Sequence, residues 1–123
     1  MLIERGWFYL ADLNPRRGTE PGKTRPVLVI QTNFLNQIGH PSTIIIPVTT
    51  KIQSDAEPLR IRIPATSKGF KVDSDLMVDQ IRAIDNRRLY KQNNDQLIKK
   101  IARVDEKIMK RVEECLKIIC DVY

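Results

Sequence analysis

The residues best suited to chemistry lie together in one short segment, between Arg16 and Pro26. Glycine and proline are interspersed there with four basic side chains, one carboxylate and two threonine hydroxyls. Arginine presents a planar fork that matches the oxygens of a phosphate group. Apolar runs flank the segment, from Gly6 to Leu13 and from Val27 to Ile30. This pattern predicts a loop between two strands, which either binds a phosphate-bearing partner or is a solvated hairpin loop.

The composition of the whole chain favours a polyanionic partner. The 123 residues suit one domain, with 41% hydrophobic and 29% charged residues and no repeat or linker, so we expect a single domain over residues 1–123. The formal net charge is +6, which favours nucleic acid over a membrane. No apolar run approaches the roughly 20 residues of a membrane span and no signal-peptide layout is present, so we expect a cytoplasmic protein.

Strand-like segments fill the first two thirds of the chain. Apolar and β-branched residues predict strands over Gly6–Leu13, Arg25–Gln31, Thr43–Thr49, Leu59–Ile63 and Ser74–Ile84. Pro47 lies within the third of these runs, and proline has no N–H for a sheet ladder. It therefore predicts a sheet edge, a bulge or a strand end at this point.

The last third of the chain changes to a helical period. Apolar residues recur at three- and four-residue steps from Ile101 to Ile119, and Asp105 is a plausible N-cap. These features predict a helix from Asp105 to Val122. Short strands followed by a helix predict an α+β fold, a small and strongly curved antiparallel β-barrel with the helix on its edge.

The sequence offers no set of metal ligands. No cluster of His, Cys, Asp and Glu has the right spacing, which disfavours a metal-dependent nuclease, and we expect no cofactor. Cys115 and Cys120 are five residues apart, so on a helix they point to different sides. His40 is the only histidine and lies in a Gly-His-Pro-Ser turn, so no histidine pair can transfer protons.

Two residues stand at predicted strand ends where they could meet a phosphate. Arg25 begins the strand after the loop, and its guanidinium could stabilise charge on a scissile phosphate or form a surface salt bridge. Thr49 ends the third strand, and its hydroxyl could donate to a phosphoryl oxygen or simply belong to a β-branched strand residue. Glu20, in the loop, could act as a general base.

Five segments follow one another along the chain in a characteristic order: Gly6–Pro15, Gly18-Thr19-Glu20, Thr24–Ile30, Ile46–Thr50 and Val78–Asp85. In order and spacing they resemble the MazF/PemK family of toxin ribonucleases. The resemblance implies an SH3-like barrel of the MazF/CcdB type. It also implies that Arg25 and Thr49 form the catalytic pair.

The resemblance further implies a sequence-specific, metal-independent endoribonuclease toxin of a type II toxin–antitoxin system. Such a toxin cleaves single-stranded RNA, mainly mRNA, to 2′,3′-cyclic phosphate and 5′-OH ends and so inhibits translation and growth. A homodimer is implied, neutralised by a small acidic, MazE-like antitoxin. Some members use the acid at the position of Asp79, but they place a basic residue where this chain has Met77 and a histidine in the loop that holds Arg16 and Arg17. These departures favour the Arg25 and Thr49 arrangement.

Recognition of single-stranded RNA usually combines base stacking with hydrogen bonds to base edges. The predicted RNA-binding residues are Thr19, Arg17, Lys51, Gln53, Phe70, Asp79, Gln80 and Arg82. Asp79 and Gln80 could instead tie down loop backbone. In the resembled family, the polar loop that corresponds to Lys51–Pro58 covers the RNA groove and can be displaced by the antitoxin.

Two other functions are compatible with such a barrel. CcdB-like toxins poison gyrase through a C-terminal Trp-Gly-Ile, whereas this chain ends Asp121-Val122-Tyr123. A basic barrel could also bind nucleic acid without cleaving it. The combined presence of Arg25, Thr49 and Glu20 argues against this second alternative.

Overall fold

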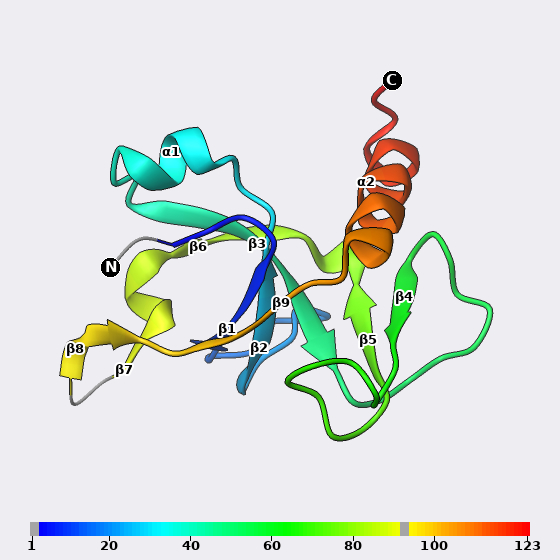
Figure 1. Cartoon of the computed structure of the whole chain (residues 1–123), viewed down its shortest axis with the longest axis horizontal. Helices are drawn as coiled ribbons and strands as arrows, with labels where there is room; N and C mark the ends of the chain where they lie inside the picture. The colour runs from blue at the N-terminus through cyan, green and yellow to red at the C-terminus, as the bar shows by residue number, and fades with distance from the viewer. Residues whose placement is uncertain (1–2, 92–93) are drawn as a thin grey trace.

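The computed structural model describes residues 3–91 and 94–123 of the chain. Its main feature is a strongly curled antiparallel sheet with a helix packed against it (Figure 1). The strands are β1 (Trp7–Asp12), β2 (Thr24–Val29), β3 (Ser42–Thr49), β4 (Arg60–Ile63), β5 (Ser74–Met77), β6 (Arg82–Asp85), β7 (Tyr90–Lys91), β8 (Asn94–Ile98) and β9 (Lys100–Arg103). The helices are α1 (Asn33–Gln37) and α2 (Glu106–Cys120), and two 3₁₀ turns are η1 (Val78–Gln80) and η2 (Asn86–Leu89).

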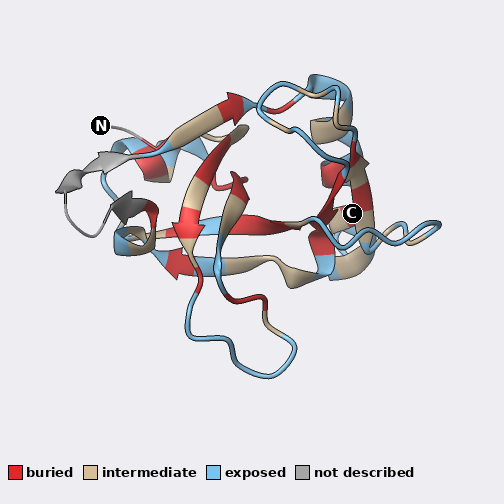
Figure 2. Cartoon of the chain, turned by 90° about the horizontal axis from the view of Figure 1, so that it is seen from below, coloured by how far each residue is buried: buried red, intermediate tan, exposed pale blue. Residues whose placement is uncertain are grey.

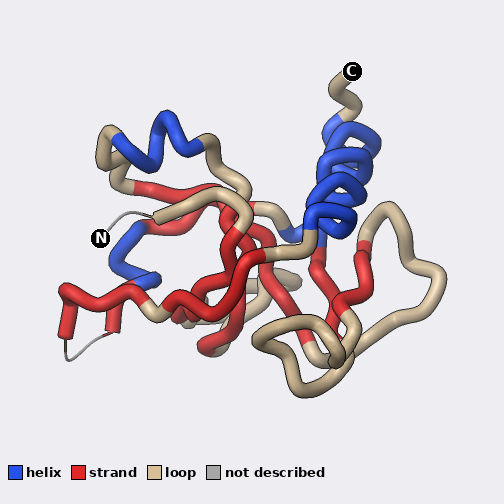
Figure 3. The backbone as a smooth tube through the Cα atoms, viewed as in Figure 1, coloured by secondary structure: helices blue, strands red, loops and turns tan. Residues whose placement is uncertain are grey.

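The main sheet runs in the order β4-β5-β3-β2-β1-β9, and β6 pairs with β3 outside this path. β7 and β8 form a separate hairpin. Figure 3 shows how the sheet bends round while α2 stands at its β4–β5 side. The predicted α+β fold, a strongly curved antiparallel sheet with a C-terminal helix, is confirmed.

The strand predicted over Ser74–Ile84 is wrong as one continuous element. It divides into β5 and β6, and η1 separates them. β6 pairs with Ser42–Ile45 of β3, and β5 pairs with Val48 and Thr49. Pro47 lies inside β3, where the β5/β6 side has no ladder partner, so its missing N–H costs nothing there. The sequence predicts a sheet edge, a bulge or a strand end at Pro47, but β3 continues through Pro47 to Thr49 inside the sheet. The missing N–H is accommodated by the gap between β5 and β6 on the neighbouring side.

Two apolar clusters occupy the two faces of the curled sheet, because successive strand residues point to opposite sides. One cluster joins the sheet to α2 and includes Phe8, Leu28, Ile46, Ile61, Leu76, Val112 and Cys115. The other includes Tyr9, Leu13, Val27, Val29, Ile45, Ile84 and Leu89. Figure 2 shows the buried residues along the strands, while the long loops are mainly exposed. The loops are therefore held at their ends by a rigid sheet.

Helix α2 begins where the sequence predicts. The Asp105 carboxylate accepts a hydrogen bond from the Lys107 N–H at 2.7 Å, which caps the first turn. The helix ends at Cys120 and not at Val122, because Asp121 adopts a left-handed conformation with φ of 54°. Ile101 lies in β9, a strand that the helical period concealed. No helix in the described ranges has the length and apolar character needed to cross a membrane.

Candidate active site

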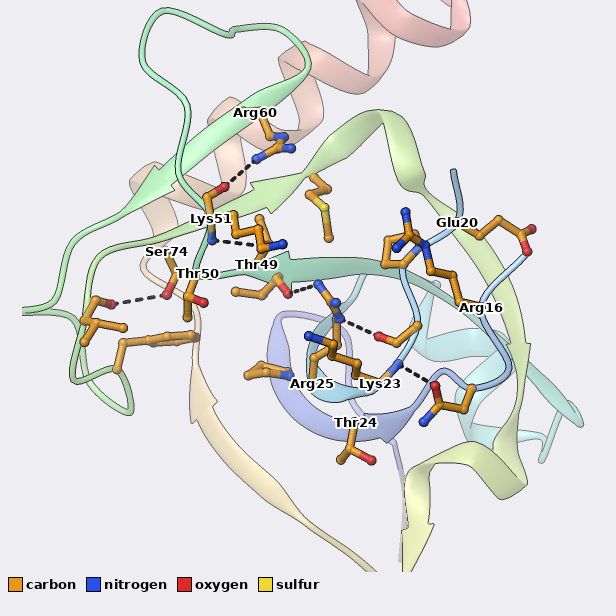
Figure 4. A pocket seen from close by; sticks show the side chains of 18 of the residues that line it. Arg16, Glu20, Lys23, Thr24, Arg25, Thr49, Thr50, Lys51, Arg60 and Ser74 are labelled. Carbon is orange, nitrogen blue, oxygen red and sulfur yellow. Dashed lines mark hydrogen bonds between the residues drawn. The ribbon is translucent and has the colours of Figure 1, made fainter. Parts of the chain in front are cut away.

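A groove of about 710 Å³ opens at one end of the curled sheet. Three segments line it: the β1–β2 loop, the end of β3 with the residues that follow, and the β4–β5 loop. Figure 4 shows Arg25 near its centre, with Thr49, Thr50 and Lys51 on one side and Arg16 on the other. The groove therefore gathers residues that are far apart in the sequence.

The β1–β2 loop is folded back tightly on itself. A Cβ at Gly22 would lie 2.7 Å from the Cβ of Arg16, so the two sides of the loop can approach only with glycine here. The Asn14 side chain accepts a hydrogen bond from the Lys23 N–H at 2.8 Å. Arg88 of η2 donates to the carbonyls of Asp12 and Asn14, at 3.1 and 2.6 Å. These contacts fix the loop and direct the Gly22 carbonyl toward Arg25.

Two backbone carbonyls hold the Arg25 guanidinium in place. Nε donates to the Gly22 carbonyl at 2.8 Å, and Nη1 donates to the Val48 carbonyl at 3.1 Å. No hydrogen bond from Nη2 is found among the described residues. Burial lowers the pKa of the Arg25 guanidinium below its usual value, and the charge of Arg16 lowers that pKa further. Arg25 is thus a preorganised cation whose remaining donors are free for a ligand.

The register of β2 and β3 places Thr49 beside Arg25. Val27 of β2 is opposite Pro47 of β3. Because the strands are antiparallel, Arg25, two residues before Val27, lies level with Thr49, two residues after Pro47. The Thr49 Oγ1 accepts a hydrogen bond from the Lys51 N–H at 3.1 Å, which leaves its hydroxyl proton available to donate. A guanidinium and a hydroxyl donor consequently face the same hollow (Figure 4).

Four more of the predicted residues line this groove: Thr19, Glu20, Lys51 and Phe70. The Phe70 ring packs edge-on against Phe8, with ring centroids 4.9 Å apart, so one face of the groove rests on the core. Glu20 is part of the lining, but its carboxylate points away from Arg25 (Figure 4). The structure thus brings Arg25 and Thr49 together and leaves Glu20 turned outward.

The other predicted residues lie outside the groove lining. Gln53 lines a neighbouring hollow of about 500 Å³, and Arg17 is exposed in the β1–β2 loop. Asp79 and Gln80 form part of η1, and Arg82 begins β6 opposite Ile45 of β3. Their expected role in RNA binding stays a prediction, and the geometry of this chain does not place Asp79 beside Arg25 and Thr49.

Sequence reasoning placed Arg16 and Lys23 in the predicted phosphate-binding loop, but it missed the groove cations Arg60 and Lys71 and a buried carboxylate. Arg16, Lys23, Arg60 and Lys71 line the groove together with Arg25 and Lys51. Asp75 on β5 is only 1% exposed and accepts hydrogen bonds from Arg60 and Arg62 of β4. The available signal was the alternation of Arg60 and Arg62 with two apolar residues, since two arginines on one strand face call for an acid on the next strand.

No group of three or more His, Cys, Asp and Glu side chains in the described part of the chain could hold a metal ion. Cys115 is buried and Cys120 is exposed, and both are free thiols. The two cysteines therefore differ in their surroundings, as their spacing on the helix predicts.

Comparison with known proteins decides the family. A profile described as "PemK-like, MazF-like toxin of type II toxin-antitoxin system" matches residues 4–120. The chain belongs to this toxin family. A relative from Bacillus subtilis (strain 168), named "Endoribonuclease EndoA", is 39% identical to the toxin over 118 residues, which are 96% of this chain and 94% of the relative.

Solved structures have the same fold at lower identity. MazF from Deinococcus radiodurans superimposes on the toxin with a TM-score of 0.76 at 20% identity, over 98% of each chain. The Mycobacterium tuberculosis toxin MazF-mt6 gives a TM-score of 0.71 at 17% identity, over 95% of this chain and 98% of that one. The resemblance seen in the sequence motifs is thereby confirmed for both family and fold.

Proposed function

We propose that this toxin cleaves single-stranded RNA in the groove beside β2 and β3, without a metal, and that Arg25 and Thr49 contact the scissile phosphate. One observation carries the proposal: two backbone carbonyls fix the Arg25 guanidinium next to a free hydroxyl donor in a cation-lined groove. Preorganised donors of this kind stabilise charge that develops in a transition state.

The class of activity is endoribonuclease. The chain belongs to a family of type II toxins, and its 39% identical relative is named an endoribonuclease. The match spans nearly the full length of both proteins, so the whole catalytic domain is compared. Single-stranded RNA and a preference for mRNA remain parts of the proposal, as does a cytoplasmic location.

In the proposed reaction, the 2′-hydroxyl oxygen of the RNA attacks the adjacent phosphorus and the bond to the 5′-oxygen of the next nucleotide breaks. The attacking hydroxyl loses its proton to a base, and the leaving 5′-oxygen gains one. Arg25 and the Thr49 hydroxyl donate to the phosphoryl oxygens as negative charge grows on them. The products are a 2′,3′-cyclic phosphate and a 5′-OH.

Glu20 is the proposed base of this reaction. Its carboxylate lines the groove but points away from Arg25, so it must rotate about its side-chain torsions to reach a 2′-hydroxyl. Such a rotation is compatible with its partly exposed position in the β1–β2 loop. The group that protonates the leaving oxygen is not assigned to a residue.

The rest of the groove suits a single RNA strand. Lys51, Lys71, Arg16 and Arg60 provide positive charge along it, and such charge attracts a phosphodiester backbone. Phe70 supplies an aromatic side chain to the lining, and bases of a single strand stack on aromatic rings. We place the bases next to the scissile phosphate against the Phe70 side of the groove.

A homodimer and an acidic antitoxin complete the proposal. Among the similar structures is a MazE–MazF complex from Deinococcus radiodurans with a TM-score of 0.73 and 17% identity, and another is titled an endoribonuclease "in complex with its cognate antitoxin from Mycobacterial species". The net charge of +6 is complementary to an acidic partner. The groove cations are the proposed contact surface.

The proposed function is tested by incubating a long single-stranded RNA with the purified toxin in excess EDTA. We expect cleavage at a limited set of sites at the rate seen without EDTA. Loss of cleavage on chelation, restored by Mg²⁺, contradicts the metal-independent mechanism. Binding without cleavage under both conditions contradicts the enzymatic function itself.

A further inference from the structure

We infer that Asp75 is a positioning residue for RNA cleavage: together with Arg62 and Arg60 it anchors the first residues of the β3–β4 loop and so holds Thr49 and Lys51 in place at the groove. The inference rests on the proposed function of Arg25 and Thr49. It assigns a role to a carboxylate that the proposed chemistry itself does not use.

The Asp75 carboxylate is saturated by contacts from two elements. Oδ1 accepts from Arg62 Nε at 2.7 Å, and Oδ2 accepts from the Gln53 backbone N–H at 2.8 Å. Arg60 Nη1 is 3.4 Å from Oδ2. The carboxylate is 1% exposed, so neither oxygen is solvated by bulk water. One buried acid therefore links β5, β4 and the loop that leaves β3.

The two arginines extend the anchor into the loop backbone. Arg60 Nη1 also donates to the Lys51 carbonyl at 3.1 Å, and Arg62 Nη2 donates to the Gln53 carbonyl at 3.4 Å. The backbone of Lys51 and Gln53 is thus held from both its N–H and C=O sides. These contacts lie within four residues of the end of β3.

The anchor reaches the catalytic groove through a short path. Asp75 is the cross-strand partner of Thr49, and the Lys51 N–H donates to the Thr49 hydroxyl oxygen at 3.1 Å. Lys51, whose carbonyl Arg60 holds, is therefore the residue that orients Thr49. Figure 4 shows the Arg60–Lys51–Thr49 chain of contacts along one wall of the groove. A loop that loses the anchor would also lose the orientation of this hydroxyl.

The outer half of the same loop has a separate attachment. Glu57 forms an ion pair with Arg111 of α2, and both side chains are about half exposed, at 51% and 50%. An exposed pair of this kind contributes little to stability. It is also far along the loop from Thr49. Glu57→Gln is therefore a matched control, because it removes a carboxylate–arginine pair from the same loop without touching the anchor.

The test compares Asp75→Asn, Glu57→Gln and wild type. Single-turnover cleavage of one RNA gives the rate, its dependence on toxin concentration gives the apparent affinity, and hydrogen exchange reports the Gln53 and Lys51 amides. We expect Asp75→Asn to slow cleavage by about 10- to 100-fold, since a misplacement near 1 Å costs about 10²-fold. The apparent affinity should stay within threefold, because the groove cations remain. Glu57→Gln should cleave at the wild-type rate.

The inference is overturned if Asp75→Asn cleaves within threefold of the wild-type rate, measured well below its melting temperature, while the Gln53 amide exchanges faster. The anchor would then be purely structural. Arg25→Ala is measured in parallel. Normal cleavage by that variant contradicts the proposed function itself, whatever the result for Asp75→Asn. If Asp75→Asn does not fold, Arg62→Gln keeps the carboxylate and carries the same expectations. Arg60 is left unchanged because it also lines the groove.

Discussion

Replacement of Arg25 should have a large effect on the rate of RNA cleavage, because the contacts of its side chain are well defined. Its guanidinium uses Nε and Nη1 to bind two backbone carbonyls, at 2.8 and 3.1 Å, and keeps its other donors toward the groove. Arg25→Ala removes this fixed charge. Loss of one preorganised donor to developing negative charge typically slows a reaction about 10²- to 10³-fold, and we expect a loss of at least this size.

Arg25→Lys separates charge from geometry. The ammonium keeps the positive charge but lacks the planar fork, so it cannot bind both carbonyls and a phosphate in the same arrangement. We expect it to recover only a small part of the lost rate. Arg87→Ala is the matched control, because Arg87 is an exposed arginine that pairs with Asp85 away from the groove.

The assay is single-turnover cleavage of one RNA by the four proteins, with circular dichroism to confirm the fold. In Arg25→Ala the two backbone carbonyls lose their hydrogen-bond donor, and each lost bond lowers the free energy of unfolding by about 1 kcal/mol. A protein with an intact core tolerates a loss of this size. If Arg25→Ala is folded and cleaves within threefold of wild type, Arg25 is a surface residue and the proposed site is wrong.

Two further predictions concern the groove wall and the assembly. Thr49→Ala should slow cleavage less than Arg25→Ala does in the same assay, because a neutral hydroxyl stabilises developing charge less than a guanidinium; an equal or greater loss would reverse the assigned roles. The purified toxin should sediment as a dimer, because four apolar side chains are more than half exposed: Phe34 and Ile38 of the α1 region, and Ile118 and Val122 at the end of α2. A monomer at micromolar concentration would count against this expectation.

Local patterns in the sequence predict the local structure well. The alternation over Leu59–Ile63 gives β4 with Ile61 and Ile63 buried, and Asp105 caps α2. The break between β5 and β6 was missed because the run from Ser74 to Ile84 contains no glycine or proline to mark a turn, and only pairing with β3 divides it. β9 was missed because Ile101 continues the apolar period of the following helix.

The candidate site was also predictable where local sequence decides the structure, and not where the pairing of distant strands decides it. Arg25 and Thr49 could be named from their positions at strand ends and from the resemblance to the toxin family, but their proximity depends on the β2–β3 register, which local sequence does not encode. Asp75 escaped notice for a related reason. The sign in the sequence was indirect, because Arg60 and Arg62 indicate that an acid lies on the next strand, but only the pairing of β4 with β5 identifies it as Asp75.

The central claim is that a 2′-hydroxyl attacks a phosphate held by Arg25 and Thr49. It is tested most directly with one short RNA that contains a single cleavage site, compared with the same RNA carrying 2′-deoxyribose at the nucleotide before that site. We predict that the all-ribose RNA gives a 2′,3′-cyclic phosphate and a 5′-OH by mass spectrometry, and that the substituted RNA is not cut there. Cleavage of the substituted RNA, or products that carry a 5′-phosphate, would contradict the account.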